Sequence, residues 1–329
     1  MEAVRCPSQM KRVAIYTNLH KVCGSGIYGH ELAAALSRWY DVIRVEADDR
    51  IDNLQTCGNA DVAILNWHAA RVPLSASKIA ELRETGTRVI LIHQNTSAHF
   101  AGNLSTDDQN EILAAAELVV THEPFICPFP TVYIPIGVPE ISPLPSINQF
   151  VTIGTAGFPF PWKRTDVVVK VAERLECYAH IVASRYGNMD FSADYANWRD
   201  RLGQHLDLWT DFEPVDSVVC QLARCWVNIF WFESKSSGDE LGQSGSARLG
   251  VAAQRPMIIS RHRKFETFKP YADEFYVAKS PRHALRIAKR IIRNIQEGLP
   301  VHIPNRILKD QGWSRVGKMF ADLIEGLFT

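Results

Sequence analysis

The segment FVTIGTAGFPFPWKRTDVVVKVAERL (150–175) decides the fold. Its first eight residues, FVTIGTAG, have the apolar and β-branched character of a buried strand. The last eleven, TDVVVKVAERL, follow an amphipathic pattern that predicts a helix capped by Thr165. A strand that leads through a turn into a helix is the repeating unit of a parallel α/β sheet.

The same unit recurs on both sides of this segment. Strand-like runs occur before it at 11–18, 41–48, 60–68 and 87–95, separated by helical patterns such as YGHELAAALSRWY (28–40). After it, strands and helices alternate again in HIVAS, YANWRDRLGQHL, VDSVVCQLARC, WVNIFWFE, SGSARLGVAAQ, PMIIS and PRHALRIAKRIIRNIQEG. Such alternation implies right-handed crossovers and helices on both faces of each sheet. We predict an α/β protein of two doubly wound, Rossmann-like domains with a cleft between them.

The linker between the domains is expected at EISPLPSINQF, which is rich in proline and serine. This places an N-terminal domain at 1–140, a linker at 141–150 and a C-terminal domain at 151–310. A final amphipathic helix occupies 311–329.

Composition excludes several classes of protein. The chain has 329 residues, 46% of them hydrophobic, with 36 Lys and Arg against 36 Asp and Glu. No run of about 18 apolar residues could span a membrane, and no secretory signal precedes the first strand. The seven cysteines are odd in number and contain no C-x-x-C pair, which argues against a disulfide framework or a zinc site. We expect a cytoplasmic protein with reduced thiols.

Charge is divided unevenly along the chain. Residues 1–140 carry 11 Lys and Arg against 16 Asp and Glu, whereas the remainder carries 25 against 20. We therefore expect an anionic ligand to be held mainly by the second half.

A first candidate site is the glycine-containing stretch at 24–29. It matches G-x-G-x-x-G, with Glu46 about 20 residues on, as in NAD-dependent oxidoreductases. Five residues separate it from the preceding strand, which argues against that function. In the alternative we favour, a flexible loop at Gly24, Ser25 and Gly26 presents backbone N–H groups to a phosphate or sugar. A plain turn is the remaining interpretation.

Two further candidates lie in the second half. In the turn after FVTIGTA, Gly157 precedes Lys163 and Arg164, whose charges could neutralise a diphosphate or could simply be solvated. The strand WVNIFWF opens into a polar loop and a short helix that starts at Ser244, Gly245 and Ser246. These residues offer hydroxyls and helix N–H groups to an anion, although a Ser-Gly-Ser cap needs no ligand.

Taken in order, these segments resemble the GT-B-fold glycosyltransferases, and in particular the large retaining family that includes sucrose synthases and bacterial mannosyltransferases. The resemblance covers nearly the whole chain. It is carried by GSGIYGHELAAAL (24–36), IPIGVP (134–139), GFPFPWKRTD (157–166), ARLGVAAQRPMIIS (247–260) and GWSRVGKMF (312–320).

The resemblance implies a function and a division of roles. The second domain would bind a nucleotide-diphosphate sugar, the first would bind a hydroxyl acceptor, and the C-terminal helix would cross back to the first domain. A sugar would be transferred, a hexose being expected, with retention of configuration, and the donor phosphate would help to deprotonate the acceptor. The acceptor could be a saccharide, a lipid-linked glycan, a protein or a modified nucleobase.

Two departures from the family pattern matter. Phe158 stands where an arginine usually follows the glycine of the diphosphate turn, and Leu249 stands where a second glutamate is usual. Glu240 and Gln243, with the Ser-Gly-Ser turn, could replace that glutamate. Arg248 could supply the charge that Phe158 lacks. The alternative is a catalytically silent nucleotide-sugar-binding protein.

In the first domain, His93 ends the strand TRVILIHQN, where the family often places a histidine near the donor sugar. A histidine there can stabilise developing charge, although a core histidine is the other interpretation. Glu123 is a candidate acceptor-side base. No D-x-D triplet occurs in the sequence, so we expect no metal and no cofactor beyond the donor itself.

Overall fold

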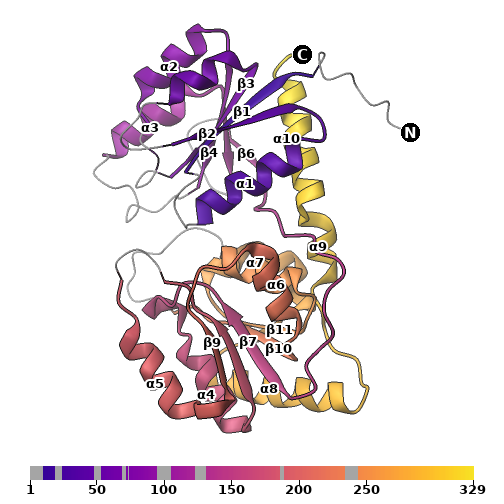
Figure 1. Ribbon diagram of the computed structural model, residues 1–329. Coiled ribbons are helices and arrows are strands. Elements are labelled where there is room, and N and C mark those ends of the chain that lie inside the picture. The colour runs from indigo at the N-terminus through magenta and orange to yellow at the C-terminus, as the bar shows by residue number, and fades with distance from the viewer. Residues whose placement is uncertain are drawn as a thin grey trace. The chain divides into compact units, whose positions relative to one another are not determined.

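The computed structural model describes residues 10–18, 24–47, 53–68, 72, 74–94, 105–122, 131–185, 189–233 and 244–329. It divides into two compact units (Figure 1). The N-terminal unit combines the chain up to Gly137 with Trp313–Thr329, and the C-terminal unit comprises Val138–Asp239 and Gln243–Gly312. The last helix therefore belongs to the same unit as the first.

The N-terminal unit is built on a six-stranded, all-parallel sheet in the order β2-β1-β3-β4-β5-β6. In register, Trp67 pairs with His93 and His93 with Thr121, so three strands end together. Polar residues that follow these strands are thus gathered along one edge. The strands are β1 (Arg12–Thr17), β2 (Asp41–Glu46), β3 (Val62–Trp67), β4 (Arg88–His93), β5 (Leu118–Thr121) and β6 (Thr131–Tyr133).

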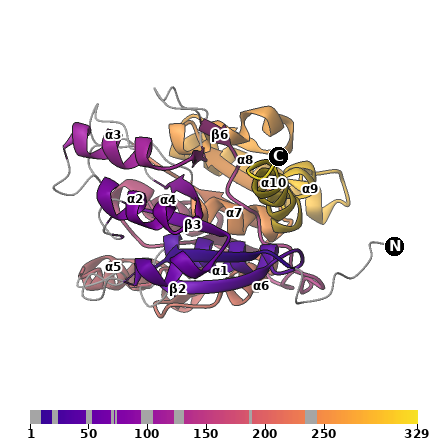
Figure 2. The same cartoon turned by 90° about the horizontal axis from the view of Figure 1, so that it is seen from above.

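Helices cover both faces of this sheet. Because side chains alternate along a strand, Val13 and Ile15 pack with helices α1 and α10, whereas Ala14 and Tyr16 pack on the face of α2 and α3. Helices α2 and α3 lie next to each other (Figure 2). The bounds are α1 (Gly24–Leu36), α2 (Ala76–Glu84), α3 (Thr106–Ala115) and α10 (Trp313–Gly326).

Helix α10 completes the core on the α1 face. Phe320 and Ile324 are fully buried there. Gly317 lies so close to α1 that an ideal β-carbon on it would be 2.8 Å from Cβ of Ala35. The Tyr40 hydroxyl donates a hydrogen bond of 3.1 Å to the carbonyl of Ala321. The small residues at this contact bring the two helix backbones together.

The C-terminal unit contains a second six-stranded parallel sheet, in the order β12-β11-β10-β7-β8-β9. Helices α4, α5 and α8 pack on one face, and α6 and α7 on the other. The strands are β7 (Thr152–Ala156), β8 (Tyr178–Val182), β9 (Leu206–Trp209), β10 (Val227–Phe230), β11 (Met257–Ser260) and β12 (Tyr276–Ala278). The helices are α4 (Asp166–Leu175), α5 (Ser192–Leu202), α6 (Val215–Ala223), α7 (Gly245–Ala252), α8 (Pro281–Gln296) and α9 (Asn305–Gln311).

The predicted fold class is confirmed: both sheets are parallel and wound on both faces. Local predictions differ in three places. The edge strands β9 and β12 were not expected, α1 begins at Gly24 instead of Tyr28, and Thr165 makes no side-chain capping hydrogen bond to α4. Within the described ranges, no helix is both long and apolar enough to cross a membrane.

Candidate functional site

The carboxyl edge of the C-terminal sheet brings three predicted donor residues together. Gly157 follows β7 with φ +123°, a conformation that glycine adopts readily and other residues do not. An ideal β-carbon there would lie 2.8 Å from Nζ of Lys163 and 3.0 Å from Cβ of Ser246. A turn, a cation and the start of α7 therefore meet around one glycine.

Lys163 is held among aromatic rings. It ends the 3-10 turn Pro161–Lys163, and its ammonium lies 5.7 Å from the ring centre of Phe158, 5.8 Å from that of Phe160 and 6.0 Å from that of Phe232. Ring faces attract cations, and the apolar surroundings exclude water that would otherwise screen the charge. The half-buried ammonium is thus both stabilised and poised for an anion.

Helix α7 begins at this point with a serine cap. The Ser244 hydroxyl accepts a hydrogen bond of 3.2 Å from the backbone N–H of Ala247 and lies 3.2 Å from the hydroxyl of Ser246. Gly245 is exposed, and no atom lies within 4 Å of where its β-carbon would be. The first N–H groups of a helix lack partners within the helix, so this open position suits a bound anion.

Arg164 differs from its predicted role. Its guanidinium donates to both carboxylate oxygens of Asp166, at 2.8 and 3.1 Å, and also to Glu233. The hydrogen bond to Asp166 raises the pKa of Arg164. Burial would raise the pKa of Asp166, but hydrogen bonds from Arg164 and Lys170 outweigh it and lower that pKa. Two carboxylates thus neutralise Arg164, which fixes the turn beside Lys163.

Arg248 also differs from its predicted role. Its side chain is 1% exposed, donates a 2.8 Å hydrogen bond to Oε1 of Gln311 and lies 5.7 Å from the ring centre of Phe268. A guanidinium enclosed in this way joins α7 to α9. Leu249 is half-buried and packs against the same core, so no acidic side chain stands at the position of the usual second glutamate.

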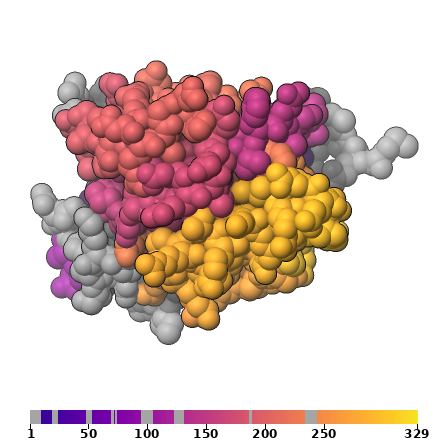
Figure 3. Space-filling model, turned by 90° about the horizontal axis from the view of Figure 1, so that it is seen from below, coloured from indigo at the N-terminus to yellow at the C-terminus, as the bar shows by residue number. Residues whose placement is uncertain are grey.

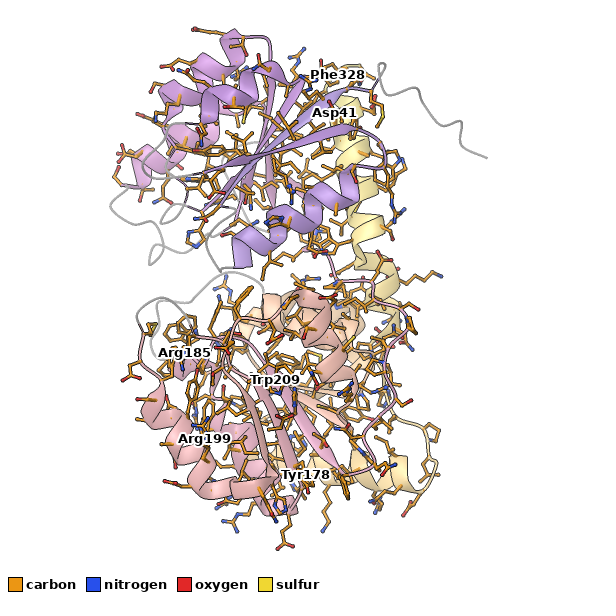
Figure 4. All side chains as sticks on the ribbon, viewed as in Figure 1. Asp41, Tyr178, Arg185, Arg199, Trp209 and Phe328 are labelled. Carbon is orange, nitrogen blue, oxygen red and sulfur yellow. The ribbon has the colours of Figure 1, made fainter. Side chains whose placement is uncertain are left out.

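A cation that sequence analysis missed is Arg185. It follows β8 and is exposed, and its backbone N–H donates a 3.0 Å hydrogen bond to the carbonyl of Thr210. Figure 4 shows Arg185 at the end of the sheet opposite Tyr178, the first residue of β8. The sequence feature that could have identified Arg185 is its position directly after a buried strand, because open parallel sheets bind ligands at the edge where their strands end.

In the N-terminal unit, the carboxyl edge of the sheet holds a buried polar network. The Asn66 amide donates to the hydroxyl of Thr17 and to the carbonyl of Ser25, both at 2.8 Å. The Gln94 amide donates to Oδ1 of Asn66 at 2.6 Å and lies 3.4 Å from Nε2 of His122. Thr17, Asn66 and Gln94 were also missed, although each stands at or just after the end of a strand.

His93 ends β4 within the same edge. It is buried, and its ring stacks on that of Trp67 with 5.2 Å between ring centres. His122 lies further along the edge, where its Nδ1 is 2.8 Å from the carbonyl oxygen of Ile134 and its ring is 4.8 Å from that of Tyr28. Both imidazoles are therefore held by ring packing at strand ends.

The glycine stretch is helical and does not form the flexible loop we expected. Gly24, Ser25 and Gly26 make up the first turn of α1, where Ser25 and Gly26 are buried and Gly24 is exposed. An ideal β-carbon on Gly29 would lie 2.5 Å from Cγ2 of Thr17, so this glycine lets the helix approach β1. A dinucleotide motif needs its first glycine in the turn itself, which counts against an NAD-dependent oxidoreductase.

Three predicted site residues, Glu123, Glu240 and Gln243, lie outside the described residues. Within the described part of the chain, His, Cys, Asp and Glu side chains do not gather in threes where they could hold a metal ion. The cysteines described there are free thiols. Burial raises the pKa of Cys57 to about 12 and that of Cys177 to about 11, so these two thiols are unreactive core residues.

Comparison with known proteins extends the structural description. No protein-family model matches the chain, and no curated protein matches its sequence. The structure is similar to HepE of Anabaena solved in complex with UDP, with a TM-score of 0.68 and 11% identity over 96% of this chain and 100% of that one. The same protein has also been solved with UDP-glucose.

Two other solved structures are similar over nearly their whole length. A glycosyltransferase from Rickettsia africae has a TM-score of 0.69 and 10% identity, covering 98% of this chain and 99% of that one. Sucrose-phosphate synthase from Thermosynechococcus elongatus has a TM-score of 0.68 and 12% identity, covering 97% and 99%. At such low identity the shared property is the fold, and the chain has the GT-B fold of these glycosyltransferases.

Proposed function

We propose that the chain is a glycosyltransferase that moves a sugar, a hexose in our proposal, from a nucleoside-diphosphate sugar to a hydroxyl acceptor. The bond between the anomeric carbon and the diphosphate oxygen breaks, and a bond to the acceptor oxygen forms with retention of configuration. The acceptor proton passes to an oxygen of the departing diphosphate. The protein's main task is then to stabilise that leaving group.

The observation that carries this proposal is the convergence of Gly157, Lys163 and Ser246 at the carboxyl edge of the C-terminal sheet. The glycine lets the ammonium and the start of α7 approach the turn. The ammonium would neutralise an anion bound beside them, and the start of α7 adds N–H groups and the positive end of a helix dipole. Solved structures of the same fold hold UDP and UDP-glucose, which supports a nucleoside diphosphate as the ligand here.

The N-terminal unit is proposed to bind the acceptor. At its polar edge the half-buried Gln94, held by Asn66 and His122, offers an amide that can exchange hydrogen bonds with sugar hydroxyls. His93 is assigned to the transferred sugar, where an imidazole can stabilise the charge that develops in the transition state. Glu123 keeps its proposed role as an acceptor-side base, Glu240 is proposed as a catalytic residue in place of the usual glutamate, and Gln243 is proposed as a donor ligand.

Transfer is proposed to need no metal and no cofactor other than the donor. This proposal is supported by the absence of a D-x-D triplet from the sequence and by the position of Lys163 beside Gly157, where its charge could take the place of a metal ion. Full activity in EDTA is the expected result. Activity that EDTA abolishes and magnesium or manganese restores would contradict this assignment of the leaving-group role.

A thermal-stabilisation screen with UDP, GDP and ADP sugars tests the binding step. A donor present at 100 times its dissociation constant adds about 2.7 kcal/mol to stability. Each stabilising donor is then incubated with pooled saccharide, lipid and protein acceptors, and release of the nucleoside diphosphate is measured. Failure of every nucleotide sugar to stabilise the protein would refute the proposal.

Phe158 and Leu249 favour a second candidate function, that of a nucleotide-sugar-binding protein without catalytic activity. These residues replace an arginine and a glutamate that are usual in the family the sequence resembles, and Leu249 packs into the core. A catalytically silent protein that binds nucleotide sugars would have such losses. It would be stabilised by a donor as strongly as an enzyme, yet would neither transfer nor hydrolyse it.

A further inference from the structure

Helix α8 presents a stripe of cations on the surface of the C-terminal unit. Its apolar face, with Ala284, Ile287, Ala288 and Ile291, is buried in the core. The opposite face is exposed and carries positive side chains three or four residues apart, a spacing that aligns them on one side of a helix. At about 1.5 Å per residue, the stripe runs for roughly 17 Å. We call it the α8 stripe: Arg282, Arg286, Lys289, Arg290 and Arg293.

The α8 stripe is not compensated by acidic residues. The sequence contains no Asp or Glu between Glu274 and Glu297. Within the described part of the chain, ion pairs bind other exposed cations such as Lys269 and Arg306, but none involves the five residues of the stripe. Like charges at this spacing destabilise a helix, so the stripe does not serve the stability of the free protein.

Beside the stripe, α8 and β12 border an open hollow of about 620 Å³. Arg286, Arg290 and His302 line it, and the Arg290 guanidinium lies 5.7 Å from the ring centre of Tyr276. Asp273 also lines the hollow, and its carboxylate accepts a 2.7 Å hydrogen bond from Nη2 of Arg306. The acidic group is thus neutralised, and the hollow has the size and charge to admit a phosphate headgroup.

Exposed aliphatic side chains accompany these cations. Val277, on β12, is 37% exposed and lines the same hollow, and Leu299, in the turn after α8, is 49% exposed. In Figure 3 the orange-to-yellow part of the chain, which includes α8, forms part of the visible surface. Cations beside exposed aliphatic groups are typical of surfaces that lie on anionic lipid. Surfaces that bind single-stranded nucleic acid combine cations with several exposed aromatic rings instead.

We propose that the α8 stripe, with its adjoining hollow and the side chains of Val277 and Leu299, binds an anionic membrane surface. The cations meet lipid phosphates, one headgroup enters the hollow between Arg286 and Arg290, and the two aliphatic side chains enter the headgroup layer. This inference is independent of the transfer reaction, since none of these residues takes part in the proposed donor or acceptor sites.

Vesicle co-sedimentation tests the proposal. The protein is expected to bind vesicles that contain phosphatidylglycerol but not vesicles of phosphatidylcholine alone. Its binding to the anionic vesicles should weaken as the salt concentration is raised. At about fivefold per cation near an anionic surface, the double variant Arg286→Glu/Arg290→Glu is expected to bind at least 25-fold more weakly. The variant Val277→Ser/Leu299→Ser is expected to bind more weakly at unchanged charge.

The matched control is Lys269→Glu/Lys318→Glu, which changes net charge by the same amount at exposed sites outside the stripe. It is expected to bind vesicles within twofold of the parent chain, and melting curves verify that both charge variants are folded. Equal vesicle binding by the two charge variants would overturn the proposal. So would binding of inorganic phosphate or RNA at the stripe without any binding to anionic vesicles.

Discussion

Gly157 and Lys163 lie so close together that an ideal β-carbon on the glycine would be 2.8 Å from the lysine Nζ. The backbone of Gly157 is also tied to the sheet, since its N–H donates a 2.9 Å hydrogen bond to the carbonyl of Val182. The ammonium is thereby held at a fixed place relative to the end of β7. The absence of a side chain lets the ammonium and the start of α7 come close to the end of β7, and we place the diphosphate beside them.

Gly157→Ala is expected to disturb both the fold and the site. A non-glycine residue at φ +123° is strained by about 1–3 kcal/mol, and the added methyl group displaces Lys163. Urea unfolding and isothermal titration with UDP measure the two effects. The matched control is Gly203→Ala, which is also strained, with φ +52°, but has no atom within 4 Å. It should lose stability and keep the parent affinity for nucleotide.

Lys163→Ala is expected to weaken binding of a nucleoside diphosphate by about 1.5–3 kcal/mol, the range for hydrogen bonds to charged groups. Stability should change by less than about 1 kcal/mol, because the side chain is only half-buried. Lys269→Ala removes a more exposed cation from the same unit and should leave affinity unchanged. Equal affinities of Lys163→Ala and the parent for the nucleoside diphosphate would show that this lysine is a solvated side chain with no role in binding.

Gly245→Val tests the start of α7. The open position at Gly245 would be filled by a branched side chain, which blocks access of an anion to the first N–H groups of the helix. The helix itself should persist, because valine has a higher helix propensity than glycine. Titrations are expected to show loss of nucleoside diphosphate binding. Gly326→Val, at another open helix position, serves as the control and should bind normally.

Asp166→Asn tests the ion cluster under the donor turn. Because the folded-state pKa of Asp166 is lowered, its stabilising effect is complete above the ordinary value of 3.8 and is lost as pH falls through the lower folded value. At pH 6 the free energy of unfolding of the variant should be about 1 kcal/mol lower than that of the parent. This difference in the free energy of unfolding, measured by urea unfolding, should be smaller at pH 3. A gap that widens in acid would contradict the assignment.

Phe320→Ala tests whether α10 is an integral part of the N-terminal unit. The side chain is fully buried beneath the β-sheet face shared with α1. Truncation of a buried phenylalanine is expected to cost about 3–5 kcal/mol. Chemical unfolding measures the loss, and Phe328→Ala, at a 44% exposed position nearby in the sequence, is the control. A loss below 1 kcal/mol would show that α10 is only loosely attached.

Much of the fold was predictable because its signals are local. Apolar runs, glycine turns and helical periodicity repeat along the chain, and together they specify parallel sheets covered on both faces. The edge strands Leu206–Trp209 and Tyr276–Ala278 escaped prediction because they are only four and three residues long. Strands of this kind form because a neighbouring strand offers hydrogen bonds, which a sequence pattern does not reveal.

The candidate site was predictable where a residue acts through its position, and less so where it acts through a distant partner. Lys163 follows a strand and a turn, and this placement alone pointed to an anion. Arg164 stands beside it and, besides its neighbour Asp166, it binds Glu233, 69 residues away. Arg248 is likewise bound by Gln311, 63 residues away. Neither pairing has a signature in the neighbouring sequence.

The place of α10 in the N-terminal unit has a consequence for biosynthesis. The ribosome makes the sheet strands of this unit within the first 137 residues, but Trp313–Gly326, which cover one face of that sheet, emerge last. A nascent chain therefore exposes the apolar surface around Val13, Ile15 and Leu32 throughout the synthesis of the C-terminal unit. The C-terminal unit can therefore complete its core first, although it is translated second, because all of its segments precede Trp313.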